Sequence, residues 1–362
     1  MKKFIAGFGE LMLRLSPEGK HRLCQVLPGS LSATFGGAEA NVCASVAALG
    51  GSALFLSRLP QNPVGLAALF QLRALGVETS RVYVDQRRRL GLYYTESGSN
   101  QRGSKVYYDR QGSAFALAKA DDYDFDMMLH DVSIMHLSGI TPALSRNAFQ
   151  VSIALLAEAQ KRGVMVSCDL NFRRQLWGWE PGLDANQLAE ECMAGILPYC
   201  SILVANESDA YEVFSMGEAV DGMIEEADSY LEVAAKLAQR FPNLKKIALT
   251  LRENISADHN LWSGMLYDCE QAQAYWAPLD KKGNYAPYQI AHVVDRFGGG
   301  DAFCAGLLFA LQQQEYSEPS RALAFATAAS CLKHSICGDY NYSFLDEVEA
   351  LLQGDVSGRV QR

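Results

Sequence analysis

Three consecutive glycines stand directly before an aspartate in the stretch DRFGGGDAF, residues 295–303. Glycine adopts backbone conformations closed to other residues, so Gly298, Gly299 and Gly300 can turn several N–H groups toward one point. A helix that begins at Asp301 would add its unpaired amides and its dipole to such an anion-binding pocket. The carboxylate beside the anion could then take a proton from an attacking hydroxyl, which is the arrangement for phosphoryl transfer to an alcohol. The alternative is a tight turn with Asp301 as a helix N-cap.

A second glycine pair opens the stretch GGAEANVCASVAALG, residues 36–50. The pattern predicts a helix whose first turn is free of bulky side chains, so its backbone can approach a ligand closely. Asn41 would project a polar side chain from that turn. Close packing between helices is the alternative reason for these small residues.

Other candidate motifs lack a necessary part. GFGELM (7–12) has no third glycine for a dinucleotide fingerprint, and GSNQRGSK (98–105) has serine where a P-loop needs lysine. The second stretch is better read as a turn. The charge runs RRR (87–89) and DDYDFD (121–126) are expected to be solvated. The six histidines and nine cysteines show no metal-ligand spacing.

The elements that must position these residues follow from the alternation of short apolar runs with longer helical patterns. VSIMHLS (132–138) precedes a helical pattern over 145–163, and VMVSCDL (164–170) follows it. SILVAN and KKIALTL (245–251) repeat the strand pattern further on. Strands separated by helices predict βαβ units and an α/β fold with a doubly wound, mostly parallel sheet flanked by helices. Before this region, Asn62 as N-cap, Pro63 and Gly76 delimit another helix.

Two segments depart from this pattern. Residues 11–35 and 90–117 alternate aromatic and polar residues, as in LGLYYTE and SKVYYDR. This alternation predicts β-hairpins with one wet face. We interpret them as a small β-sheet that forms a lid on a single α/β domain spanning residues 1–362.

Composition limits the classes of partner. The formal net charge is −9, so nucleic acid and anionic membranes are disfavoured, although a local arginine cluster can still bind a small anion. Glu10 and Arg14 interrupt the N-terminal apolar run, which we interpret as a first strand and not a signal peptide. The sequence has no run of eighteen apolar residues, so it predicts no membrane-spanning helix. Scattered cysteines suggest reduced thiols and a cytoplasmic protein.

The two glycine stretches together identify a family resemblance. GGAEAN and DRFGGGDAFCAG, roughly 260 residues apart, resemble the two signatures of the PfkB, or ribokinase-like, carbohydrate kinases. Within that family the chain is most similar to the 2-keto-3-deoxygluconate kinases, and the similarity extends over nearly the whole chain. The supporting stretches are GLYY (91–94), KVYYDRQGSA (105–114), HLSGITPALS (136–145), DLNFRRQLW (169–177) and CGDY (337–340).

The resemblance implies a role for each matching residue. Asp301 matches the catalytic base, and Gly298, Gly299 and Gly300 match the anion hole. Substrate contacts are implied for Gly37, Asn41, Tyr93, Tyr108, Arg110, Arg173 and Asp339. Nucleotide contacts are implied for Asn171, Asn206 and Thr250.

Three positions differ from the family pattern. Arg296 replaces the small residue that usually follows Asp295, as in part of the subfamily. The magnesium motif reads NESD, with Asp209 where glutamate is usual, so a metal contact through water is implied there. The loop expected after IALTL reads RENISADHN (252–260) and has no glycines, which puts the adenine and ribose contacts in doubt.

The leading hypothesis is therefore an ATP-dependent kinase that phosphorylates the terminal hydroxyl of 2-keto-3-deoxygluconate. Arg110 and Arg173 favour a substrate with a carboxylate, because a guanidinium offers it a planar fork. The implied cofactors are ATP and Mg²⁺, with a monovalent cation left open, and the implied assembly is a homodimer or higher homo-oligomer through the lid. The alternatives are a kinase for another sugar or sugar acid, such as a fructokinase, a catalytically silent sugar-binding protein, and a nicotinamide oxidoreductase.

Overall fold

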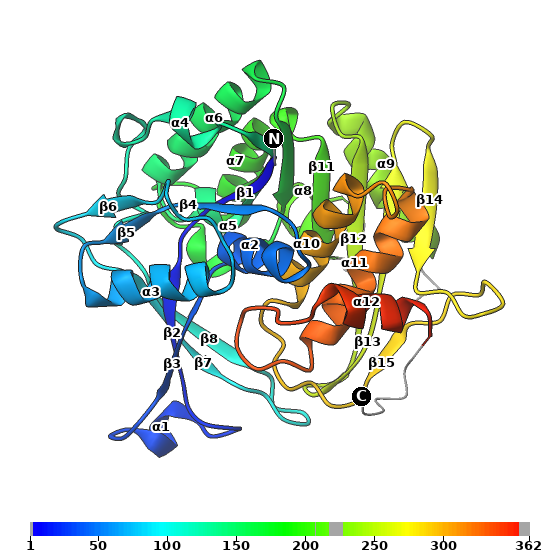
Figure 1. The fold of residues 1–362 in the computed structure, drawn as a ribbon, viewed down its shortest axis with the longest axis horizontal. Coiled ribbons are helices and arrows are strands. Elements are labelled where there is room, and N and C mark those ends of the chain that lie inside the picture. The colour runs from blue at the N-terminus through cyan, green and yellow to red at the C-terminus, as the bar shows by residue number, and fades with distance from the viewer. Residues whose placement is uncertain (1–2, 207, 217–226, 355–362) are drawn as a thin grey trace.

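A large sheet between two layers of helices forms the body of the molecule, and a smaller sheet projects from one end of it (Figure 1). The computed structural model describes residues 3–206, 208–216 and 227–354. Within them the large sheet has nine strands in the order β14-β13-β12-β11-β10-β9-β1-β4, with β15 paired to β13. The pairings from β4 to β12 are parallel, and β13 is antiparallel to each of its partners. The strands are β1 (Phe4–Phe8), β4 (Ala53–Leu56), β9 (Val132–Ser138), β10 (Met165–Asp169), β11 (Ile202–Asn206), β12 (Lys246–Ser256), β13 (His259–Asp268), β14 (Gln273–Ala277) and β15 (Tyr288–Ile290).

Each face of the large sheet is covered by helices, so its strands are buried on both sides and read as continuous apolar runs. Alternate residues of one strand point to opposite cores: Val204 of β11 packs with the first layer of helices, and Leu203 with the second. The first layer comprises α2 (Ala38–Ala48), α3 (Pro63–Ala74), α10 (Gly299–Gln312), α11 (Pro319–Lys333) and α12 (Leu345–Leu352). The second comprises α4 (Phe125–Met128), α5 (Ile140–Ala143), α6 (Arg146–Lys161), α7 (Ala185–Ile196), α8 (Asp209–Phe214) and α9 (Ala227–Arg240).

The helix boundaries have identifiable causes. The side chain of Asn62 accepts a hydrogen bond from Gly65 N at 2.9 Å at the start of α3, where Pro63 takes the first helical position. Gly76 follows that helix with φ of +83°. Ser145 Oγ accepts from Ala148 N at 3.0 Å and caps α6 in the same way. The predicted punctuation of α3 is confirmed.

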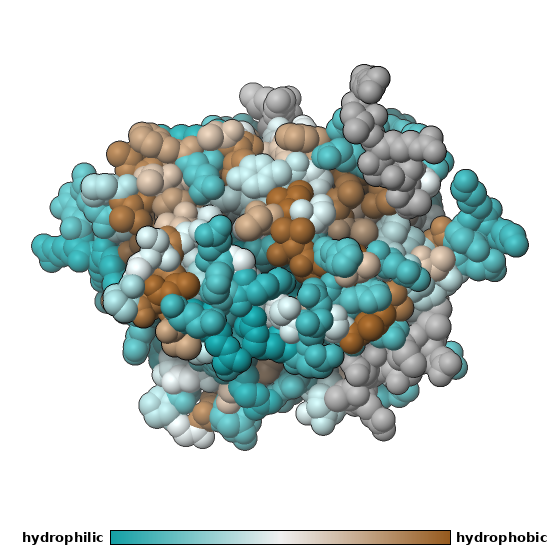
Figure 2. Space-filling view, turned by 90° about the horizontal axis from the view of Figure 1, so that it is seen from below, coloured by the Kyte–Doolittle hydropathy of each residue, from teal (hydrophilic) through white to brown (hydrophobic). Residues whose placement is uncertain are grey.

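The smaller sheet, called the lid below, has four strands in the order β3-β2-β7-β8. They are β2 (Met12–Ser16), β3 (Ser32–Gly36), β7 (Gly91–Glu96) and β8 (Lys105–Asp109), with the short helix α1 (Leu23–Val26) between β2 and β3. Figure 2 looks from below onto the end where the lid projects, and hydrophilic residues gather over the middle of this face. A two-stranded parallel ribbon, β5 (Arg58–Pro60) with β6 (Tyr83–Asp85), lies beside α3 (Figure 1). The predicted α/β class with a separate small sheet is confirmed.

Two local predictions need correction. Residues 252–260 do not form a loop after a strand that ends at Leu251, because β12 continues to Ser256 and pairs with β13 as a long hairpin. The run 121–126 is not wholly solvated either, since Tyr123 is buried in a cluster of aromatic rings with Phe8 and Tyr83. No helix in the described ranges is both long and apolar enough to cross a bilayer.

Candidate active site

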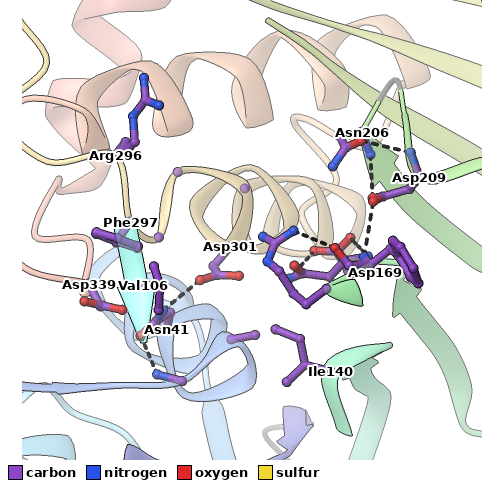
Figure 3. Close-up of a pocket in the computed structure, with 18 of the residues that line it drawn as sticks. Asn41, Val106, Ile140, Asp169, Asn206, Asp209, Arg296, Phe297, Asp301 and Asp339 are labelled. Carbon is purple, nitrogen blue, oxygen red and sulfur yellow. Dashed lines mark hydrogen bonds between the residues drawn. The ribbon is translucent and has the colours of Figure 1, made fainter. Parts of the chain in front are cut away.

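A cavity of about 640 Å³ lies between the lid, the carboxyl ends of β10 and β11, the middle of β12 and the N-terminus of α10. Open α/β sheets bind ligands at this edge of the strands. Figure 3 shows this cavity with its lining residues drawn as sticks. All the site residues implied by the family resemblance line it: Gly37, Asn41, Tyr93, Tyr108, Arg110, Asn171, Arg173, Asn206, Asp209, Thr250, Gly298, Gly299, Gly300, Asp301 and Asp339.

Asp301 lies in the first turn of α10, but it is not the N-cap. The helix begins two residues earlier, at Gly299, and Gly298 is the N-cap with φ of +78°, a left-handed conformation that favours glycine. The side chain of Asp301 instead accepts a hydrogen bond from Asn41 Nδ2 at 2.7 Å (Figure 3). The expectation of a helix that begins at Asp301 was therefore wrong, and the carboxylate is free of a capping role.

The environment of Asp301 adjusts its acidity. Burial raises the pKa of this carboxyl to about 7, with Asp339 and Glu39 adding to the rise, while the Asn41 hydrogen bond and Arg173 oppose it. A carboxylate with a pKa near neutrality can both accept and release a proton at physiological pH. These properties are those of a general base.

The N-terminus of α10 presents unpaired amides. The first bond of the helix is donated by Ala302 N to Gly298 O at 2.8 Å. Within the described part of the chain, the backbone N–H groups of Gly298, Gly299, Gly300 and Asp301 have no hydrogen-bond acceptor. Four free donors at the positive end of a fourteen-residue helix form a site for an anion such as a phosphoryl group.

Asp339 forms part of a buried charge network at the root of the lid. Its Oδ1 accepts from Arg14 Nη1 at 2.7 Å, and its Oδ2 accepts from Tyr93 Oη at 2.6 Å. The same guanidinium reaches Asp295 at 2.8 Å and lies over the ring of Phe297. Although burial opposes it, Asp339 and Asp295 raise the pKa of the Arg14 guanidinium. The network joins lid strand β2 to the loop that leads into the glycine turn.

Arg110 lies at the end of lid strand β8 and is paired. Its Nε donates to Glu10 Oε2 at 2.7 Å, and both side chains are buried. Within this pair Arg110 Nη1 and Glu10 Oε1 have no hydrogen-bond partner. One free donor beside one free acceptor suits a ligand that carries a carboxylate or carbonyl oxygen next to a hydroxyl.

The glycine pair before α2 is required by close contacts. A Cβ on Gly36 would lie 2.5 Å from Asp339 Oδ2, and one on Gly37 would overlap the carbonyl oxygen of Glu10. The pair therefore lets the start of α2 approach both charged pairs of the lid root. This packing role accompanies any substrate contact that Gly37 makes.

The loop after β10 supplies Asn171 and Arg173. Asn171 has φ of +39° and donates to Asp169 from its backbone N at 3.2 Å and from Nδ2 at 3.3 Å. Its Oδ1 is buried without a partner. Burial raises the pKa of Asp169 well above its usual range, as do the neighbouring Asp209 and Asp301. Arg173 donates to Phe172 O at 3.0 Å and provides positive charge among these carboxyl groups.

Asp209 ties two loops together. Its Oδ1 accepts from Phe172 N at 3.2 Å, and its Oδ2 accepts from Asn206 N at 3.1 Å (Figure 3). Asn206 Oδ1 in turn accepts from the backbone of Ser208 and Asp209. Thr250 lies opposite Asn206 across the β11–β12 pairing. No cluster of three or more metal-ligating side chains occurs in the described ranges, so the site fits Mg²⁺ only as an ion that ligand phosphates and water largely coordinate.

The β12–β13 hairpin brings unpaired donors to the cavity where the glycine-containing loop was expected. Arg252 and Trp262 are directly opposite each other in the hairpin, and Arg296 lies beside them. The nitrogens without a partner are Arg252 Nε, Trp262 Nε1 and Arg296 Nε. Burial and the neighbouring Arg252 lower the pKa of Arg296. Figure 3 shows the Arg296 side chain directed away from Asn41 and Asp301.

Charged residues that line the cavity but were not predicted as site residues include Asp169, Arg174, Glu212 and Arg252. Three further charged side chains in or beside the site were also not predicted. They are Glu10, Arg14 and Glu39, and each is buried. Glu39 Oε1 accepts from Ser138 N at 2.8 Å and Thr141 Oγ1 at 2.8 Å, and so joins α2 to the end of β9. A signal existed for the first two, since Glu10 and Arg14 interrupt an otherwise apolar run of the sequence, where a charge is tolerated only with a partner.

Comparison with known proteins adds a family match. The model of the pfkB family carbohydrate kinases matches residues 2–251 of the chain. Asp301 and the glycine turn lie beyond that span, so the site geometry and the family match are separate observations.

Individual relatives extend the similarity over the whole length. The chain is 32% identical over 352 residues to the 2-dehydro-3-deoxygalactonokinase of Haloferax volcanii, covering 97% of each chain. It is 27% identical over 305 residues to the 2-dehydro-3-deoxygluconokinase of Thermoproteus tenax, covering 84% of this chain and 80% of the relative. Among solved structures, the 2-dehydro-3-deoxygluconokinase of Thermotoga maritima superposes with a TM-score of 0.86 at 37% identity, covering 97% of this chain and 100% of the other.

Proposed function

The chain belongs to the pfkB family of carbohydrate kinases, and from that premise we propose that it transfers the γ-phosphate of ATP to the terminal hydroxyl of 2-keto-3-deoxygluconate. The observation that carries the proposal is the position of Asp301. Its buried carboxylate lies beside four unpaired amides at the start of α10, in the same cavity as Arg110 and Arg173. A sugar-binding protein without catalysis would have no use for this base.

In the proposed reaction the amides of the glycine turn bind the transferred phosphoryl group. Asp301 accepts the proton of the terminal hydroxyl as that oxygen attacks phosphorus, and Asn41 keeps the carboxylate oriented. The bond to the ADP oxygen breaks and ADP leaves. Mg²⁺ bound to the phosphates would neutralise part of their charge, with Asp209 close enough to the nucleotide loops for a contact through water.

The acceptor is held at the lid. Arg110 has a free donor nitrogen, and Arg173 contributes charge from the opposite wall. We assign the carboxylate of the sugar acid to these arginines and the hydroxyls to Tyr93, Tyr108, Gly37 and Asp339. Tyr93 already donates to Asp339, so a substrate hydroxyl would join an existing hydrogen-bond network.

A second candidate acceptor is 2-keto-3-deoxygalactonate, the epimer at C4. The relative from Haloferax volcanii carries that substrate in its name, and it is 32% identical over nearly the full length of both chains. An epimer changes the direction of one hydroxyl and leaves the carboxylate and the reacting hydroxyl unchanged. Both acids therefore suit the same arginines.

The nucleotide would lie along the carboxyl end of β11 and the middle of β12. Asn206 and Thr250 line that part of the cavity, and Asn171 offers a buried acceptor without a partner. A buried acceptor without a partner destabilises the protein until a ligand donates a hydrogen bond to it. An amino or hydroxyl group of the nucleotide, or a bound water, is the expected donor.

The test is a coupled assay with ATP, Mg²⁺ and a panel of 2-keto-3-deoxygluconate, its C4 epimer, fructose and ribose. We expect the two sugar acids to exceed the neutral sugars in kcat/KM by about ten- to a hundredfold, because a charge-assisted contact contributes about 1.5–3 kcal/mol. Equal efficiencies for acids and neutral sugars would contradict the assignment. The ratio between the epimers decides between the two acids.

The outer face of the lid is proposed to bind a second copy of the chain. Leu15 and Tyr94 lie opposite each other there, and Tyr107 is 46% exposed. An apolar sheet face of this kind is usually covered. We expect a dimer by sedimentation at micromolar concentration, and a monomer for Leu15→Glu; a monomeric wild-type chain would contradict the proposal.

A further inference from the structure

Among the residues that the structure describes, one lysine is fully buried. Lys333, the last residue of α11, has a relative exposure of 0%. Its Nζ donates to the carbonyl oxygen of Ile336 at 3.0 Å, and no carboxylate of the described residues lies within 4.0 Å of it. An ammonium group is strongly hydrated in water, so its burial with a single hydrogen bond is costly and calls for a reason.

The position of Lys333 supplies a reason, because the side chain lies against the glycine turn. A Cβ on Gly298 would lie 3.2 Å from Lys333 Cε. The backbone around the lysine is bonded to the same loop: Val294 N donates to His334 O at 2.9 Å, and Gly338 N donates to Asp295 Oδ2 at 3.0 Å. The ammonium is therefore fixed behind the amides that bind the phosphoryl group.

Lys333 lies among carboxylates that Arg14 alone does not neutralise. Arg14 pairs with both Asp295 and Asp339, which leaves one negative charge in excess. Asp295 and Asp339 are the largest favourable electrostatic neighbours of Lys333, and Asp301 is a further one. Burial lowers the pKa of Lys333 and these carboxylates oppose that change, so the cluster favours the charged form.

We propose that Lys333 is a positioning residue for phosphoryl transfer, whose ammonium serves as a built-in cation behind the glycine turn. It holds Gly298 and the loop from Asp295 in place. It also stabilises the negative charge that gathers on the transferred phosphoryl group, because a fixed charge in a poorly solvated interior acts strongly over a few ångströms. The inference rests on the proposed function, and it implies that the enzyme needs no dissociable monovalent cation at this position.

The first experiment compares Lys333→Met with Lys161→Met, which removes an exposed lysine of α6. Methionine keeps most of the length of lysine and removes the charge. We expect kcat of K333M to fall by about ten- to a hundredfold, with the KM for the sugar acid within about threefold of wild type, while K161M stays unchanged. A wild-type kcat for K333M overturns the proposal.

The second experiment separates charge from packing. Lys333→Ala leaves space that a small cation can enter, so ammonium or methylammonium chloride should restore part of the lost kcat, and tetramethylammonium chloride at equal ionic strength should not. Replacing KCl with tetramethylammonium chloride should leave the wild-type rate unchanged. A loss in K333A that neither small cation reduces overturns the proposal, and this variant also decides the matter if K333M does not fold.

A third measurement stays informative if the wild-type chain phosphorylates none of the acceptors, an outcome that would count against the proposed function alone. Calorimetry of ATP and ADP binding without an acceptor reports on the turn directly, because only ATP brings a γ-phosphate to it. We expect K333M to lose affinity for ATP selectively, by about tenfold. An unchanged ratio of ATP to ADP affinity overturns the role of Lys333.

Discussion

The two ends of the cavity differ in how their polar groups are satisfied. At the lid end, called the acceptor end here, the polar side chains are bonded in pairs: Arg110 to Glu10, Arg14 to Asp339, and Asn41 to Asp301. Single atoms without a partner remain inside one of these pairs, at Arg110 Nη1 and Glu10 Oε1. At the end beside the β12–β13 hairpin, the nucleotide end, Arg252, Trp262 and Arg296 each leave a nitrogen without a partner.

This difference indicates which end is shaped in advance. A paired end keeps its geometry before the substrate arrives, which suits discrimination between similar sugars. At an end with unpaired donors, a bound anion supplies the missing hydrogen-bond acceptors. Binding is therefore favoured because it satisfies these donors. Variants at the acceptor end should therefore change both stability and catalysis, whereas variants at the nucleotide end should change nucleotide affinity alone.

The largest effect is expected where the two ends meet, at Asp301. Asp301→Asn keeps the shape and an acceptor for Asn41 but removes the base, so kcat should fall by about 10²–10⁴ with both substrates still bound. Thermal melting should accompany the rate assay. If turnover stays near wild type, Asp301 is not the base.

The same variant has a predictable effect on stability. The folded-state pKa of Asp301 is about 7, above its ordinary value of 3.8. Ionisation of this carboxyl therefore destabilises the folded state, and the destabilisation is complete once the pH exceeds 7. D301N should therefore be more stable than wild type at pH 8, by up to about 4 kcal/mol. At pH 4 the gain should vanish, because the carboxyl is then protonated in the folded chain. A gain that persists at pH 4 would contradict this cause.

The acceptor end can be broken at its buried ion pair. Arg110→Met leaves Glu10 buried without its partner and should destabilise the fold by about 3–5 kcal/mol, whereas the double variant E10Q/R110M should recover most of that loss. Arg89→Met provides the matched control, because it breaks an exposed ion pair with Asp109 on the same lid, worth about 1 kcal/mol or less. Chemical denaturation measures all three. Equal losses for R110M and R89M would show that burial of the pair does not matter.

The nucleotide end should respond differently. Arg252→Met removes a guanidinium that has no carboxylate within 4.0 Å in the described residues, so the melting temperature should not fall. The KM for ATP should rise about tenfold, since a charge-assisted hydrogen bond contributes about 1.5–3 kcal/mol. The KM for the sugar acid should stay constant. Arg252→Lys keeps the positive charge, so it should retain part of the wild-type affinity for ATP. A variant that loses stability but binds ATP normally would erase the contrast between the two ends.

The smallest predicted effect concerns pH. Because the pKa of Asp301 is about 7, kcat/KM should rise with pH through that value, where the base loses its proton. Asn41→Ala removes a hydrogen bond that lowers this pKa, so the rising limb should move to higher pH by about half a unit to one unit. R252M should leave the limb in place. A limb that does not move in N41A would show that Asn41 only fills space.

The sequence allowed the fold class to be predicted from local signals, whereas most of the predicted cavity residues came from the family resemblance. Glycine runs, helix caps and alternating apolar strands act over a few residues, and the helix punctuation around Asn62 and Gly76 is one confirmed case. The contact between Asn41 and Asp301 spans 260 positions, and no local pattern specifies it. The roles of the individual site residues remain predictions.

Two kinds of feature could not be predicted from the sequence. The partners of buried charges depend on tertiary packing. The sequence around Arg14 and Lys333 therefore did not indicate which carboxylates would lie near these side chains. The length of a strand depends on its neighbour: residues 252–256 continue β12 because β13 pairs with them, although Glu253, Asn254 and Ser256 have low strand propensity. Residues 252–260 lack glycines because they form the β12–β13 hairpin, and not because a nucleotide loop had lost its glycines.

Arg14 also determines how the lid can move. This side chain belongs to strand β2, yet it is bonded to Asp295 and Asp339 on the main body, and its burial makes those bonds hard to exchange for water. The lid therefore cannot swing as a rigid flap from the end of β2. We therefore expect any opening to move the distal part of the sheet, around Tyr107 and α1, while the part near Arg14 stays in place. Substrate would enter from the free edge at β8, and amide hydrogens there should exchange with solvent faster than those of β2.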